Sequence, residues 1–238
     1  MKTEDLEYKD GNVTCRGYLA YDESHAGKRP GILVVHEAFG LGKHVMDRAK
    51  MLADLGYVAL AADLYGDRKR GETLKEIGPL MNPLRENRPA LRVRARAALD
   101  ALAGLSTVDT SRMAAIGYCF GGTTVLELAR NGAPVKGVVS FHGNLTAPLP
   151  AEKGKVSASV LVCNGADDPS IPPDQVVAFE EEMRQTGADW QVINYGGTVH
   201  SFTNPAADSS LLPYTLYNES ADKRSWIAMR AFFDEIFA

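Results

Sequence analysis

The sequence predicts an α/β fold, with a mostly parallel central sheet covered by helices on both faces. Short apolar runs rich in β-branched residues alternate with longer segments of helical periodicity, which is the pattern of βαβ units. Such crossovers are right-handed, so successive strands lie parallel in one sheet. With 238 residues, 45% of them hydrophobic, the chain is long enough to bury one core. We therefore expect residues 1–238 to form a single domain.

The N-terminal part is predicted to contain a hairpin followed by the first βαβ unit. The Asp-Gly pair at 10–11 is a hairpin turn signal, so the chain is expected to open with two antiparallel strands. The apolar runs at 31–37 and 57–63 predict strands buried on both faces. Between them, apolar side chains recur at helical spacing over 43–55, and Gly56 ends that helix.

The remainder of the chain continues this alternation. Residues 70–105 predict one or two helices, with breaks near Asn82-Pro83 and Arg88-Pro89, because proline disfavours a continuing helix. The elements expected after it are strands at 113–117, 135–141, 158–164 and 190–195 and helices at 123–130, 172–186 and 219–237. Functional residues of such sheets collect on the loops beyond the carboxyl ends of the strands, so the site is expected there.

Composition narrows the possible partners. A net charge of −4 offers no basic surface for nucleic acid or anionic membranes. The N-terminus is charged, and no apolar run approaches the roughly 20 residues that cross a bilayer. Cys15, Cys119 and Cys163 are too scattered for a disulfide framework or a zinc motif. We expect a cytoplasmic monomer or small homo-oligomer that acts on a small molecule without a metal or other cofactor.

The segment Gly-Tyr-Cys-Phe-Gly at 117–121 joins a predicted strand to a predicted helix and fits the nucleophile-elbow pattern Gly-x-nucleophile-x-Gly. Larger residues in place of either glycine would collide across the tight turn. The positive end of the following helix points at Cys119 and favours its thiolate, and the N–H of Phe120 is placed to stabilise an oxyanion. The alternative is a buried structural cysteine.

The groups that would activate this cysteine follow it in the order expected on the α/β-hydrolase fold, acid and then histidine. Asp167 and Asp168 follow one predicted strand, and His200 follows the last strand. His200 would activate Cys119 and return a proton to the leaving group, while one aspartate fixes the imidazole tautomer. The residues alone do not choose between the two aspartates. Their order and placement together predict a Cys–His–Asp triad.

Four motifs resemble the dienelactone hydrolase family: VVHEAFGL, GYCFGG, GADDPSIP and VHSFTNP. The likeness covers nearly the whole chain and implies the α/β-hydrolase fold. In that family the triad acid precedes a short segment ending in a Val/Ile-Pro pair, which favours Asp168 over Asp167. The resemblance implies a hydrolase of small carboxylic esters or lactones, similar to a carboxymethylenebutenolidase, that works through an acyl-enzyme intermediate.

The resemblance also implies roles for residues of the first motif. In this family a glutamate at the end of the early strand contacts the cysteine thiol before substrate binds, and Glu37 occupies that place. A carboxylate there would disfavour the thiolate until substrate displaces it. Ala38 would supply the second oxyanion N–H. Phe39, Tyr118 and His142 are further candidates for contact with substrate.

One position departs from the family pattern. The founding enzyme type holds a substrate carboxylate with arginines, one of them four residues after the catalytic histidine, and here that residue is Asn204. The sequence selects no replacement among the candidates Arg68, Arg70, Arg85 and Arg88. Two other functions stay open: a non-catalytic small-molecule binding protein, and an acyltransferase or a hydrolase of another bond.

Overall fold

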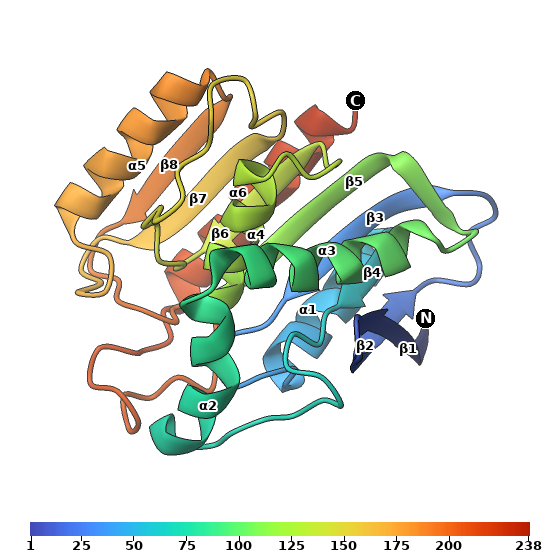
Figure 1. The fold of residues 1–238 in the computed structure, drawn as a ribbon, viewed down its shortest axis with the longest axis horizontal. Helices are drawn as coiled ribbons and strands as arrows, with labels where there is room; N and C mark the ends of the chain where they lie inside the picture. The colour runs from blue at the N-terminus through green and yellow to red at the C-terminus, as the bar shows by residue number, and fades with distance from the viewer.

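The computed structural model describes residues 1–238 and contains one eight-stranded sheet in the order β1-β2-β4-β3-β5-β6-β7-β8 (Figure 1). The β1–β2 pair is an antiparallel hairpin, and β2 joins β4 antiparallel; all other neighbours are parallel. The strands are Lys2–Asp10 (β1), Val13–Tyr21 (β2), Arg29–Val35 (β3), Val58–Ala61 (β4), Val108–Tyr118 (β5), Gly137–Phe141 (β6), Ser159–Gly165 (β7) and Trp190–Tyr195 (β8). The predicted parallel sheet and N-terminal hairpin are confirmed.

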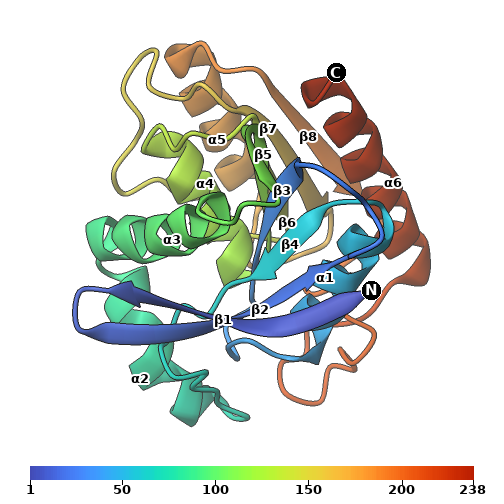
Figure 2. The same ribbon diagram turned by 90° about the vertical axis from the view of Figure 1, so that its right-hand side faces the viewer.

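The chain has six helices, five of which cover the two faces of the sheet. They are Lys43–Asp54 (α1), Leu74–Arg85 (α2), Arg88–Ala103 (α3), Phe120–Arg130 (α4), Pro173–Thr186 (α5) and Glu219–Ile236 (α6). Helices α1 and α6 lie on one face and α3, α4 and α5 on the other, while α2 projects beyond the sheet (Figure 2). None of the helices combines the length and the apolar character needed to cross a membrane.

The core is divided by the sheet into two layers. Strand side chains alternate between faces, so Ile32 and Val34 of β3 pack with α1 and α6, while Leu33 and Val35 pack on the side of α3 and α4. All four side chains are completely buried. Full burial of such a side chain contributes about 1.5–3 kcal/mol, which is why the two-sided apolar runs specify central strands.

Of the two breaks predicted in the helical region before β5, the structure has one. Pro83 lies inside α2, so no break occurs there, whereas the break predicted near Arg88-Pro89 is confirmed, because α2 ends at Arg85 and α3 begins at Arg88. The side chain of Asn87 accepts a hydrogen bond from the N–H of Ala90 at 3.1 Å and starts α3, with Pro89 in its first turn. An asparagine cap followed by proline is a strong helix start, and it decides the position of the break.

The carboxyl ends of the parallel strands bring the candidate residues to one edge of the sheet. Glu37 follows β3, Cys119 follows β5, His142 follows β6, Asp168 lies just beyond β7 and His200 lies beyond β8. Residues up to 163 positions apart in the chain (Glu37 and His200) therefore meet at a single edge.

Candidate active site

The turn at Cys119 is a strained nucleophile elbow. Its backbone has φ +55° and ψ −114°, a conformation that L-residues rarely adopt. A Cβ on Gly117 would lie 2.0 Å from the carbonyl oxygen of Gly121, and one on Gly121 would lie 2.1 Å from that of Val35. The N–H of Cys119 donates to the carbonyl of Phe141 at 3.0 Å, which helps to hold the turn. The two glycines thus allow the thiol to stand above the strand end.

His142 supports the turn at Cys119 through a hydrogen bond. The N–H of Cys119 also donates to Nδ1 of His142 at 3.1 Å, and Nε2 of His142 lies 2.8 Å from Oγ1 of Thr203. Burial, with the nearby charges of His200 and His44, lowers the pKa of His142 well below its usual value, so the ring is neutral and its proton sits on Nε2. The ring of His142 is fully buried and takes no part in lining the cavity at Cys119, and its contact with substrate stays a prediction.

Tyr118 likewise does not line the cavity at Cys119. Its side chain is completely buried and stacks on Phe141 with ring centroids 4.8 Å apart. Successive residues of a strand point to opposite faces of the sheet, and Tyr118 points into the layer formed by α1 and α6. Phe39, the third candidate, does line the cavity, so its contact with substrate stays a prediction.

Asp168 and His200 form a buried pair beside the cysteine. Nδ1 of His200 lies 2.6 Å from Oδ2 of Asp168, whose Oδ1 accepts the N–H of Ser170 at 2.8 Å. Asp168 is 3% exposed, whereas Asp167 is solvent-exposed. Burial by itself would lower the pKa of His200, but the adjacent Cys119 sulfur and the Asp168 carboxylate raise it well above its usual value. The imidazolium is therefore the favoured form whenever the sulfur carries negative charge.

Two backbone N–H groups near the thiol are free to bind an oxyanion. Phe120 is the first residue of α4, and neither its N–H nor that of Ala38 donates a hydrogen bond within the chain. Tyr65 was not foreseen from the sequence: its hydroxyl donates to the carbonyl of Ala38 at 2.8 Å, and its ring stacks on Phe120. Tyr65 thereby ties the early loop to the start of α4.

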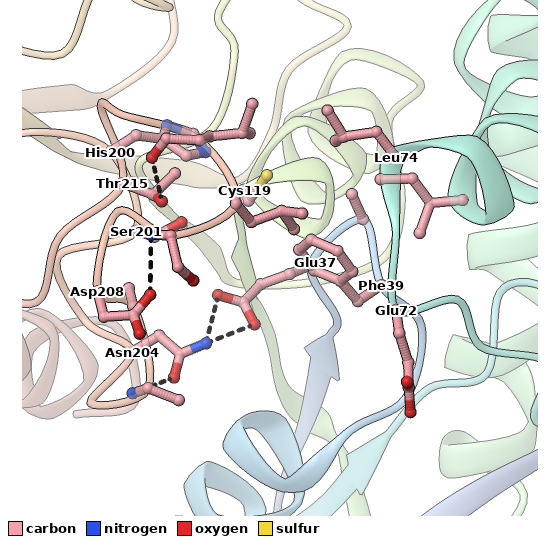
Figure 3. A pocket seen from close by; sticks show the side chains of 17 residues that line it. Glu37, Phe39, Glu72, Leu74, Cys119, His200, Ser201, Asn204, Asp208 and Thr215 are labelled. Carbon is pink, nitrogen blue, oxygen red and sulfur yellow. Dashed lines mark hydrogen bonds between the residues drawn. The ribbon is translucent and has the colours of Figure 1, made fainter.

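Glu37 faces the same cavity but is bound to Asn204 (Figure 3). The amide Nδ2 of Asn204 donates to both carboxylate oxygens, at 3.2 and 3.1 Å. Burial would raise the pKa of Glu37, but His44, Asn204 and the charge of His200 together lower it below its usual value. The expected contact between Glu37 and the Cys119 thiol is thus replaced by one to Asn204, the residue that departs from the family pattern.

A row of buried polar groups stands behind Glu37. Arg48 binds Oδ1 of Asp222 in α6 at 2.5 Å and donates from Nε to Nε2 of His44 at 3.3 Å. This places the His44 proton on Nδ1, which lies 3.4 Å from Glu37, although not aligned for a hydrogen bond. Helix α1, tied to α6 by the Arg48–Asp222 ion pair, therefore brings His44 close to the Glu37 carboxylate, and the spacing of these residues in the sequence did not predict this contact.

The cavity around the thiol has two branches that meet at Cys119 and His200. The branch on the Glu37 side has a volume of about 420 Å³ and includes the acidic side chains of Glu72 and Asp208. The other branch has a volume of about 560 Å³ and carries the cationic pair, Arg85 and Arg88. Leu74, Ile77 and Leu212 line both branches. The structure brings together no group of three or more His, Cys, Asp or Glu side chains suited to a metal.

Comparison with known proteins finds similarity over nearly the whole chain. The family model described as "Dienelactone hydrolase family" matches residues 15–237. A provisionally named carboxymethylenebutenolidase of Yersinia pestis is 31% identical over 196 residues, which are 78% of this chain and 73% of that protein.

Two solved structures are similar along their entire length. A dienelactone hydrolase-like promiscuous phosphotriesterase from metagenomic libraries is 44% identical with a TM-score of 0.95, over 99% of this chain and 98% of the other. A structure named m3DLH is 46% identical with a TM-score of 0.96, over 100% and 99% of the two chains. These relatives share the fold of the dienelactone hydrolases with this chain.

Proposed function

The chain belongs to the dienelactone hydrolase family, and we propose that it hydrolyses small carboxylic esters or lactones with Cys119 as nucleophile. One observation carries the proposal: the thiol occupies a strained elbow beside the buried His200–Asp168 pair and between two unpaired N–H groups. A nucleophile, a base, an orienting acid and an oxyanion site are the complete set that acyl transfer requires.

The first half-reaction forms an acyl-enzyme. The Cys119 thiolate attacks the carbonyl carbon, and the developing oxyanion accepts hydrogen bonds from the N–H groups of Ala38 and Phe120. The C–S bond forms, the C–O bond of the ester breaks, and the His200 imidazolium gives its proton to the departing alkoxide. The hydrogen bond to Asp168 keeps the remaining proton on Nδ1 so that Nε2 faces the reaction.

The second half-reaction releases the acid. Neutral His200 takes a proton from a water molecule, whose oxygen attacks the thioester carbonyl, and the C–S bond breaks to restore the thiolate–imidazolium pair. The carboxylic acid formed loses its proton to solvent. In a lactone the alkoxide and the acyl group belong to one molecule, so the ring opens in the first step and the hydroxy acid leaves in the second.

The role of Glu37 differs from the one that the family resemblance implies, in which the carboxylate contacts the thiol and disfavours the thiolate until substrate binds. Its carboxylate is held in place by Asn204 while the thiol remains next to His200. A fixed negative charge there supports the imidazolium electrostatically and repels anionic groups from its own branch of the cavity.

The proposal is tested by trapping the intermediate. Rapid mixing with p-nitrophenyl butyrate should release a burst of nitrophenolate matching the enzyme concentration, and mass spectrometry should find the butyryl group on Cys119. Cys119→Ala should show neither, while Cys15→Ala, which alters a buried cysteine remote from the cavity, should show both.

The outcome also separates the other functions. A folded wild-type protein that forms no adduct and releases no butyrate would refute the hydrolase and favour a binding protein. An adduct that added alcohols or amines discharge faster than water does would identify an acyltransferase.

Hydrolysis of phosphotriesters is a second candidate, favoured by the 44% identity with the promiscuous phosphotriesterase. Thiolate attack on phosphorus would form an S–P bond and break the P–O bond to the leaving group, which in paraoxon departs as the nitrophenolate anion. The unpaired N–H groups would then bind the phosphoryl oxygen. Paraoxon should leave a diethylphosphoryl group on Cys119 and release nitrophenolate; no release above that of the Cys119→Ala variant would exclude this activity.

A further inference from the structure

The Ala38 N–H, one of the two groups free to bind an oxyanion, belongs to the peptide group that joins Glu37 to Ala38. That peptide is trans and planar, so the N–H and the carbonyl of Glu37 point in opposite directions. The N–H has no acceptor within the chain, so nothing on its own side restrains it. The groups that bind the Glu37 carbonyl therefore set the direction of the Ala38 N–H.

His36 binds the carbonyl of Glu37. Its Nδ1 lies 2.6 Å from the carbonyl oxygen, and its Nε2 accepts the N–H of Leu64 at 3.2 Å. A ring nitrogen that accepts a hydrogen bond has no proton, so the proton of the neutral ring is on Nδ1. The ring is completely buried, and burial is the main cause that lowers its pKa below the usual value, so the neutral form predominates at pH 7. His36 is therefore held as a donor to the Glu37 carbonyl.

Two residues beyond the neighbouring strand fix the His36 ring. Leu64 and Tyr65 follow β4, which lies next to β3 in the sheet, so the contact at Nε2 joins the ends of two strands. The Tyr65 ring packs edge-on against the His36 ring, with centroids 4.8 Å apart. The Tyr65 hydroxyl donates to the Ala38 carbonyl. Both peptide groups that flank Ala38 are thus held at their carbonyl oxygens.

The Glu37 carbonyl has a second donor, the N–H of Gly40 at 3.2 Å, which closes the turn over residues 37–40. This bond lies within the loop and moves with it, whereas the His36 ring is anchored to the N–H of Leu64. The contact from Nδ1 is also the shorter of the two. Hydrogen bonds to a carbonyl polarise the whole peptide group, which strengthens the Ala38 N–H as a donor.

We propose that His36 is a positioning residue for the reaction, because its Nδ1–H fixes the Glu37–Ala38 peptide so that the Ala38 N–H points at the oxyanion. The inference rests on the proposed function and adds a residue that touches neither substrate nor thiol, since the ring does not line the cavity at Cys119. The oxyanion forms only as the carbonyl is attacked. His36 therefore acts on the rate of acylation and not on the binding of substrate.

Two substitutions of similar size separate the donor from the packing. The amide nitrogen of asparagine is bonded to Cγ, as Nδ1 is in histidine, so His36→Asn keeps a donor for Glu37. His36→Leu fills the site without a donor, and both variants lose the acceptor for the Leu64 N–H. In rapid mixing with p-nitrophenyl butyrate, the acylation rate constant of His36→Leu should be roughly 10- to 100-fold below that of His36→Asn, less than the loss from removing an oxyanion donor outright. The ester concentration that half-saturates the burst rate should be the same in both.

The matched pair also gives the results that would overturn the proposal. Equal acylation rate constants in the two variants would identify His36 as a packing residue. A difference that lies only in the half-saturating ester concentration would assign it to substrate binding instead. Urea unfolding of both variants checks that a slower reaction is not a loss of folded protein.

A measurement on the wild-type protein keeps the proposal testable if His36→Leu does not fold. Nitrogen-15 NMR of protein labelled at histidine distinguishes a protonated Nδ1 from a protonated Nε2, and the His36 signals are those that vanish in His36→Asn. A proton on Nδ1 alone at pH 7 supports the proposal. A proton on Nε2, or on both nitrogens, overturns it.

Failure of this inference is distinguishable from failure of the proposed function. A burst in the wild type with equal rates in the two variants leaves the hydrolase standing and removes the role of His36. If the wild type forms no acyl-enzyme and hydrolyses no ester, the proposed function fails, and the tautomer decides the remainder. A proton on Nδ1 then still supports the fixed peptide, and a proton on Nε2 overturns it.

Discussion

Replacing Asp168 by asparagine tests the catalytic arrangement most directly. The carboxylate is 3% exposed, lies 2.6 Å from Nδ1 of His200 and is positioned by the N–H of Ser170. Asparagine keeps the size and can still accept a hydrogen bond, but it removes the negative charge. The change therefore isolates the charge of Asp168 from its packing.

The expected magnitude follows from this hydrogen bond. A hydrogen bond to a charged group contributes about 1.5–3 kcal/mol, and 1.36 kcal/mol corresponds to a tenfold change in rate. The Asp168→Asn variant should therefore lose roughly 10- to 150-fold in kcat/KM. Because the carboxylate raises the pKa of His200, its loss lowers that pKa, and the imidazolium persists over a narrower range of pH. The alkaline limb of the pH profile should move to lower pH.

The assay is kcat/KM for p-nitrophenyl butyrate as a function of pH, with circular dichroism as the check on folding. Asp167→Asn is the matched control, since Asp167 is exposed and its side chain makes no hydrogen bond within the chain. It should stay within about twofold of the wild type. A larger loss in Asp167→Asn than in Asp168→Asn, or an unmoved alkaline limb in the latter, would refute the assignment of the acid.

Two further predictions concern stability. Glu37→Gln should weaken the dependence of the free energy of unfolding on pH at acid pH. The pKa of Glu37 is lowered in the folded protein, so its carboxylate stabilises the fold at pH values above the unfolded pKa near 4.5. This stabilisation is lost as the pH falls through the folded pKa. Urea unfolding from pH 7 to pH 3 should show the gap between variant and wild type closing as the pH drops; a constant gap would contradict it. Gly121→Ala should cost roughly 3 kcal/mol in the free energy of unfolding, because the new Cβ would meet the Val35 carbonyl at 2.1 Å. Gly196→Ala, at a position with open space, should cost much less, and equal costs would count against the elbow argument.

The sequence by itself determined the fold class and the positions of the reacting groups in the chain. Strands that are apolar on both faces can be buried only in the centre of a sheet that is covered on both sides. Cys119, Asp168 and His200 each follow a strand of the parallel part of the sheet, and the carboxyl ends of these strands lie at one edge. The nucleophile elbow was predictable from its two glycines, because only glycines fit where Gly117 and Gly121 approach backbone carbonyls. These features depend on local backbone geometry and on the periodicity of apolar residues, and both can be read from the sequence.

The tertiary structure decided which side chains face the cavity and what holds them. Tyr118 precedes Cys119 in the chain and His142 directly follows β6, yet both are buried, because the pleat and the turn direct them away from the cavity. The partner of Glu37 is Asn204, 167 positions away, and Nε of Arg92 donates to Glu127 whereas Nε and Nη1 of Arg88 have no hydrogen-bond partner. Such pairings depend on how helices pack across the sheet, and no spacing along the chain encodes them.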